Sequence, residues 1–241
     1  MPKAIKKRVT KKTTLQEEEV KGIVSHAMDF VREKKKTFIL ISSVVGAVLA
    51  AYIIVMFYTA SLANKAYALE KEAFNYYYGI NLKSPVQEDE RLKKALELYQ
   101  QSLKVKSTPV ALFYLGNCYY KLNDYANAVK SYASFIDKYP GEEGMLPLVY
   151  QKLASSHVNN GKADDALKTL QVLEKFKNGV FKDTALIQQA RLHETLGKPE
   201  DAKKKYEELI KEFPGSVWSA EARSKIGAGL PKEEKPATSA R

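Results

Sequence analysis

Few residues in this sequence belong to the types that carry out chemistry: three histidines, one cysteine and several adjacent carboxylates. His157 and His193 lie 36 residues apart, whereas His26 lies alone near the N-terminus. A zinc site needs about four ligands at short, regular spacing, and no such set accompanies either of the two later histidines. We therefore expect no metal and no cofactor, and we expect His157 and His193 to pack against neighbouring helices.

Catalysis finds equally little support in the sequence. The acidic pairs at residues 164–165 and 207–208 occupy positions typical of solvated helix surfaces. No glycine-rich phosphate loop or nucleophile elbow occurs, so we expect no catalytic residues and no enzyme. The single cysteine, Cys118, excludes an intrachain disulfide and a site built from several cysteines. An enzyme would require a pocket in which titratable groups converge only after folding.

A segment without any charge, residues 37–59, stands out near the N-terminus. Twelve of its 23 residues are Leu, Ile, Val or Phe. At about 1.5 Å per residue, a helix of this length covers about 34 Å, enough to cross a hydrocarbon core of about 30 Å. Buried helices of soluble proteins are seldom apolar on every face over such a length. We expect one transmembrane helix, which is uncleaved because its apolar and basic regions exceed those of a signal peptide.

The distribution of charge predicts the orientation of this span. Residues 1–36 hold eleven Lys or Arg and five Asp or Glu, a net charge of +6. Basic residues resist translocation, so the N-terminus should be cytoplasmic and the remainder of the chain periplasmic, with the tail contacting anionic lipid. The whole chain carries +11, which leaves about +5 for all later residues. That excess is too dilute for a nucleic-acid surface, which needs clustered charge.

Two features flank or occupy the span. In residues 15–36, apolar residues recur at three- and four-residue spacing, which predicts an amphipathic helix. It either rests on the inner membrane face or forms only with a partner, whereas residues 1–14 should be disordered.

Within the span, Ser42, Gly46 and Ala50 place small side chains four residues apart. Such a stripe would let another helix approach closely, in a partner protein or in a homo-oligomer.

The part of the chain after residue 108 repeats a pattern with a period near 35. Small residues are needed where two antiparallel helices cross, aromatic residues fill the gaps, and a proline prevents the second helix from continuing. The recurring positions are Leu112, Leu115, Gly116, Tyr119, Ala128, Tyr132 and Pro140, then Tyr150, Leu153, Ala154, His157, Ala166 and Leu170, then Leu186, Ala190, His193, Ala202, Tyr206 and Pro214.

This spacing resembles the tetratricopeptide repeat (TPR), and the resemblance covers residues 66–227. Residues 66–107 would be a divergent first unit, and residues 216–226 a capping helix that covers the last apolar face with Val217, Trp218, Ala222 and Ile226. The expected fold is all-α: one transmembrane helix, then a TPR-type α-solenoid of about four helical hairpins and a capping helix. The expected divisions are a basic tail (1–36), the span (37–59), membrane-proximal helices with the divergent repeat (60–108), repeats with the cap (109–227) and a disordered tail (228–241).

The resemblance also implies a binding surface. In TPR proteins, side chains of the first helix of each hairpin line a concave face that binds a peptide or protein segment. Carried onto this sequence, the groove residues would be Phe113, Asn117, Tyr120 and Lys121, then Gln151, Ser155 and Asn159, then Ile187, Arg191 and Glu194. They are mixed polar and aromatic residues, which suits an extended or helical segment.

The order of tail, span and repeats is similar to that of the single-span ancillary TPR subunit of the bacterial Sec translocon. The resemblance implies a scaffold in the bacterial inner membrane, with a translocon or a periplasmic chaperone as partner. An adaptor for the assembly of cell-wall, outer-membrane or secretion complexes is the alternative. An organelle import receptor with cytosolic repeats would need the opposite orientation.

Overall fold

The computed structural model describes residues 11–82, 84–179 and 181–227. Over these residues the chain folds into helices without any strand, which confirms the predicted all-α class. It divides into two compact units, Met1–Ser61 and Leu62–Arg241. The disorder predicted for residues 1–10 and 228–241 falls outside the described residues.

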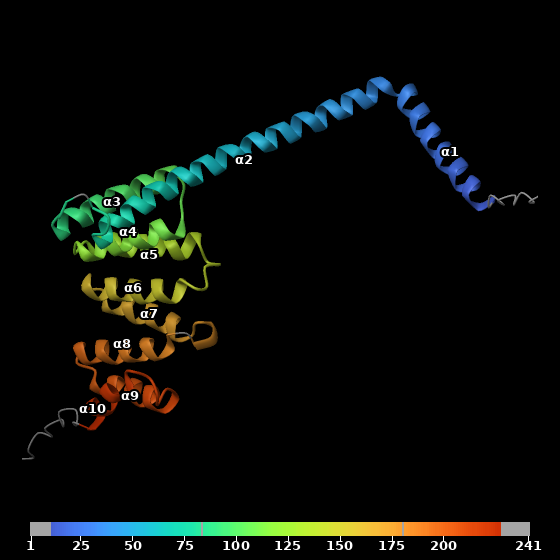
Figure 1. Cartoon of the computed structure of the whole chain (residues 1–241). Helices are drawn as coiled ribbons and strands as arrows, with labels where there is room; N and C mark the ends of the chain where they lie inside the picture. The colour runs from blue at the N-terminus through green and yellow to red at the C-terminus, as the bar shows by residue number, and fades with distance from the viewer. Residues whose placement is uncertain (1–10, 83, 180, 228–241) are drawn as a thin grey trace, which may run out of the picture. The chain divides into compact units, whose positions relative to one another are not determined.

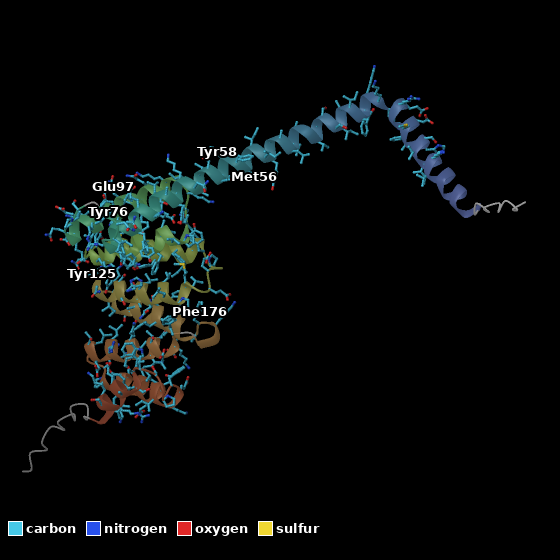
Figure 2. The ribbon with its side chains drawn as sticks, in the orientation of Figure 1. Met56, Tyr58, Tyr76, Glu97, Tyr125 and Phe176 are labelled. Carbon is cyan, nitrogen blue, oxygen red and sulfur yellow. The ribbon has the colours of Figure 1, made fainter. Side chains whose placement is uncertain are left out.

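The first unit consists of α1 (Lys11–Glu33) and most of α2 (Lys35–Tyr78), with a turn at Lys34 between them. Helix α1 begins earlier than the apolar pattern, so the disorder predicted for residues 11–14 is wrong. A helix adds one hydrogen bond per residue once it is nucleated, and it can therefore extend beyond its apolar stripe. Helix α2 is long and apolar enough to cross a membrane, and no residue of its most apolar segment is buried. Figure 2 shows Met56 and Tyr58 projecting from this helix.

The second unit is a stack of helical hairpins (Figure 1). The C-terminal part of α2 packs against the next helix in the first hairpin, and the predicted set of four hairpins with a closing helix is confirmed. The remaining elements are α3 (Glu88–Val105), α4 (Pro109–Lys121), α5 (Tyr125–Lys138), α6 (Leu146–Asn159), α7 (Ala163–Glu174), the 3₁₀ turn η1 (Lys177–Gly179), α8 (Lys182–Thr195), α9 (Pro199–Glu212) and α10 (Ser219–Gly227).

Tight turns inside the hairpins use residues with positive φ. Asn123, Gly161 and Gly197 have φ values of 61°, 72° and 66°, in the left-handed region that glycine and asparagine tolerate best. Asp124 then caps α5, because its side chain accepts a hydrogen bond from the backbone N–H of Asn127 at 3.1 Å. Asparagine and glycine therefore stand at the positions where the second helix of each of these hairpins is reached by a tight turn.

The closing helix begins later than predicted: α10 starts at Ser219, whereas residues 216–218 form the bend and turn before it, and one predicted contact is absent. Trp218, Ala222 and Ile226 pack onto the last core cluster beside α8 and α9, as expected. Val217, however, is 82% exposed, so the prediction that it covers the apolar face is wrong. It precedes α10, in the turn between α9 and α10, and the helical period therefore does not set the direction of its side chain.

The crossing of α4 and α5 depends on the absence of a side chain at Gly116. A Cβ atom at this position would lie 2.6 Å from Cε1 of Tyr132, a residue with no exposed surface. We expect Gly116→Ala to lower the free energy of unfolding by about 1–3 kcal/mol, because the buried ring must shift. Gly141→Ala is the matched control: nothing lies within 4 Å of its Cβ, and its effect should stay within about 0.5 kcal/mol. Urea denaturation measures both, and equal effects would contradict the close crossing.

Candidate functional site

A pocket of about 300 Å³ opens between the first helices of three successive hairpins. Its walls combine hydrogen-bonding and apolar side chains, and only Tyr120 and Arg191 among them are titratable. Four of the residues predicted for the groove meet here: Tyr120, Ser155, Asn159 and Arg191. The full lining is Tyr120 from α4, Ala154, Ser155, Val158 and Asn159 from α6, Leu170 from α7, and Gln188, Arg191, Leu192 and Thr195 from α8.

Helical spacing aligns the polar lining. Residues four apart share one face of a helix, so Ser155 and Asn159 follow each other along α6, as Arg191 and Thr195 do along α8. The side-chain amide of Asn159 donates a hydrogen bond to Oη of Tyr120 at 2.8 Å, which links α6 to α4 across the pocket. This hydrogen bond thus links two successive repeats at the surface where the pocket opens.

The positive charge at the pocket is balanced within the chain. Nε of Arg191 donates to Oε1 of Glu221 at 2.8 Å, and its Nη2 donates to Oε2 at 2.5 Å. The guanidinium also lies 5.0 Å from the centre of the Trp218 ring. Hydrogen bonding and charge from Arg191 lower the pKa of Glu221, so the pair stays ionised at neutral pH. The pocket therefore offers hydrogen bonds and apolar contact rather than a free cation.

Three of the predicted groove residues are buried in the core instead. Phe113 and Ile187 are 7% and 0% exposed and belong to two core clusters. Asn117 is also buried, and its side-chain oxygen accepts a hydrogen bond from the hydroxyl of Tyr132 at 2.6 Å. The spacing of residues along a helix shows which of them share a face. The rotation of the helix about its axis decides which of these residues neighbouring helices cover. These residues do not form part of the open surface.

The other three predicted residues lie outside the pocket. Lys121 donates to Glu88 at 3.0 Å, and its amine lies 5.3 Å from the centre of the Tyr77 ring. Glu194 accepts a hydrogen bond from Lys225 at 2.9 Å. Gln151 is half-buried on α6 and does not line the pocket. Lys121 and Glu194 thus connect first helices to adjoining elements.

Sequence reasoning missed three surface residues that line the pocket: Val158, Gln188 and Thr195. Gln188 and Thr195 lie three residues before and four residues after Arg191, so helical spacing around that predicted residue would have found both. Val158 is 41% exposed and adds apolar surface next to Asn159.

The two repeat histidines occupy equivalent places in α6 and α8. Nδ1 of His157 and Nδ1 of His193 are buried without a hydrogen-bond partner. Burial lowers the pKa of both imidazoles, although Asp165 and Asp201 respectively act in the opposite direction. Among the described residues, no three His, Cys, Asp or Glu side chains gather in a way that could hold a metal ion. Both histidines are therefore part of the helix packing.

Stability should consequently depend on pH in a defined window. A lowered pKa means that folding favours the neutral imidazole. The contribution of the two histidines to the free energy of unfolding is therefore complete above about pH 6.5 and is lost as the pH falls through the folded-state pKa. Between pH 7 and 5, the free energy of unfolding of the native chain should decrease. The His157→Gln, His193→Gln double variant should show a flatter pH profile in urea denaturation. An equal pH dependence of the free energy of unfolding in both proteins would contradict the assignment of this effect to the two histidines.

Comparisons with known proteins agree with this architecture. The family model described as tetratricopeptide repeat matches residues 110–141 and 184–216, which correspond to the α4–α5 and α8–α9 hairpins. The crystal structure of MamA protein has 17% sequence identity and a TM-score of 0.53, covering 69% of this chain and 81% of that chain.

Two further solved structures are similar over comparable lengths. YrrB, described as a TPR protein with an unusual peptide-binding site, has 16% identity and a TM-score of 0.47, covering 70% of this chain and 85% of that chain. The TPR2AB domain of yeast Sti1 has 15% identity and a TM-score of 0.38, covering 69% and 72%. No curated protein sequence matches the chain. The chain thus carries tetratricopeptide repeats, and its second unit is a TPR-type α-solenoid.

Proposed function

We propose that this protein is a membrane-anchored TPR scaffold whose pocket between α4, α6 and α8 binds a segment of a partner protein. The observation that carries the proposal is the convergence of Tyr120, Ser155, Asn159 and Arg191 on one pocket. Hydroxyl and amide groups can hydrogen-bond the backbone of an extended or helical segment, and Val158 and Leu192 offer apolar contact. The volume of about 300 Å³ suits a few side chains of such a segment.

The anchor is the second part of the proposal. Helix α2 supplies the span, the basic residues before it keep the N-terminus in the cytoplasm, and the solenoid lies in the periplasm of a bacterium. Anchoring confines the pocket to the membrane surface, which raises its effective concentration beside a membrane-bound partner, so that a weak pocket suffices. The partner that fits this placement best is a translocon subunit or a periplasmic chaperone near emerging chains.

Photocrosslinking tests the binding role. A photoreactive residue is placed at Tyr120, and the control carries it at Lys168 on α7, whose side chain is 76% exposed. In native membranes we expect crosslinks to translocon subunits or a periplasmic chaperone from position 120 and not from position 168. Crosslinks from position 120 to cell-wall or outer-membrane assembly factors would instead favour the alternative function, an adaptor for envelope-complex assembly. Equal crosslinking from both positions would contradict the pocket.

A protease-accessibility experiment on membrane vesicles tests the orientation separately. The solenoid should be protected from a protease added to the cytosolic side and should be digested once the vesicles are opened. Digestion of intact vesicles from the cytosolic side would contradict the periplasmic placement and would favour an import receptor with cytosolic repeats.

A further inference from the structure

Helix α1 exposes a wide apolar face. Five of its large apolar side chains are at least about half exposed: Val20 by 59%, Ile23 by 70%, Val24 by 49%, Met28 by 64% and Phe30 by 60%. At 100° per residue these five positions fall within an arc of about 160°, and the opposite arc is polar. Soluble proteins seldom leave a contiguous apolar surface of this extent uncovered.

The polar arc of α1 holds charges of both signs. It contains Lys21, Ser25, Asp29, Arg32 and Glu33, all of them exposed. A helix that is apolar on one side and charged on the other is suited to the plane between lipid and water, where both faces meet their preferred surroundings. The side-chain pattern alone would also suit a partner helix, so the occupant of the apolar face depends on what adjoins α1.

What adjoins α1 is the apolar helix α2. Helix α1 ends at Glu33 and α2 begins at Lys35, so a single residue, Lys34, separates them. If α2 crosses a membrane, as proposed above, the C-terminal end of α1 must lie at that membrane's surface. The solenoid then lies on the opposite side and cannot cover the apolar face of α1.

Charge at the junction favours an anionic membrane surface. Arg32, Lys34, Lys35 and Lys36 occupy four of five successive positions there, and the ammonium group of Lys34 lies 5.4 Å from the centre of the Phe30 ring. Each basic residue close to an anionic leaflet contributes about 1 kcal/mol. From these observations we propose that α1 is an interfacial helix that buries Val20, Ile23, Val24, Met28 and Phe30 in the headgroup region of an anionic lipid surface.

Spin labels on the full chain in vesicles of phosphatidylcholine with phosphatidylglycerol test this proposal. Single cysteines are introduced at Ile23 on the apolar face, at Ser25 on the polar face and at Val48 in α2. Native Cys118 should not react, because it is fully buried and burial raises the pKa of its thiol to about 12. The readout is the accessibility of each label to oxygen, which enters lipid, relative to a water-soluble nickel chelate.

The expected result is a higher oxygen-to-nickel ratio at Ile23 than at Ser25, with a smaller difference in vesicles of phosphatidylcholine alone. Equal ratios at Ile23 and Ser25 would overturn the proposal, and so would protection of Ile23 from both reagents, which indicates a protein partner or a second copy. An unchanged difference without phosphatidylglycerol would overturn the preference for anionic lipid. A low ratio at Val48 would instead overturn the membrane anchor on which the proposal rests.

Discussion

Replacing Tyr132 by alanine is expected to lower the free energy of unfolding by about 3–5 kcal/mol, the range found for deletion of a large buried aromatic side chain. Tyr132 has no exposed surface and lies in the core cluster with Leu112, Phe113 and Phe135. Its ring also fills the space over Gly116. Removing it leaves a cavity at the crossing of α4 and α5 and leaves the side chain of Asn117 without its hydrogen-bond donor.

Tyr132→Phe is the matched variant, because it keeps the ring and removes only the hydroxyl. It should cost about 1–3 kcal/mol, the penalty for leaving a buried acceptor on Asn117 unsatisfied. Hydrogen exchange of α4 and α5 is the appropriate measurement, because repeat arrays often unfold unit by unit. A loss below about 1 kcal/mol for Tyr132→Ala would contradict the burial of this residue.

The second large effect concerns partner binding. The Tyr120→Ala, Asn159→Ala double variant removes one wall of the pocket and the hydrogen bond that links α4 to α6. If this pair is a hot spot of the interface, its loss should cost about 2 kcal/mol or more, which corresponds to an affinity about 30-fold weaker. The free energy of unfolding should also fall, by about 1–3 kcal/mol, because the half-buried Tyr120 ring packs against the core cluster that contains Phe113 and Tyr132, and it is measured in parallel.

Lys168→Ala on α7 is the control for this measurement, since Lys168 is highly exposed and does not line the pocket. Affinity is measured with the partner captured by crosslinking, using full-length protein in nanodiscs. Unchanged affinity of the folded double variant would place the interface elsewhere. Equal weakening by Lys168→Ala would mean that the effect does not come from the pocket.

Much of the solenoid could be predicted from the sequence, because its packing rules act locally. Gly116 and Tyr132 lie where a hairpin must cross closely, and the structure brings the two side by side. Asn123 and Gly161 mark turns that need positive φ. These positions are set by contacts between the two helices of one hairpin. Because the same contacts recur in each hairpin, they appear in the sequence as a pattern with a period near 35 residues.

The lining of the pocket was less predictable, because it depends on how successive hairpins are rotated against each other. Phe113 and Tyr120 lie on the same helix, yet Phe113 is buried and Tyr120 lines the pocket. The pairing of Arg191 with Glu221 joins residues 30 positions apart and follows from the placement of α10. Neither feature leaves a periodic signal in the sequence. Of the ten groove positions carried over from the family, four therefore line the pocket, and the other six are buried or lie outside it.

Hydrogen–deuterium exchange on the full chain in nanodiscs, with and without its captured partner, tests the central claim most directly. We predict that partner binding slows exchange at the C-terminal ends of α4, α6 and α8, around Tyr120, Asn159 and Thr195, and leaves α5 and α9, which do not line the pocket, unchanged. Protection confined to those second helices, with none around the pocket, would contradict the assignment of this pocket as the partner-binding site.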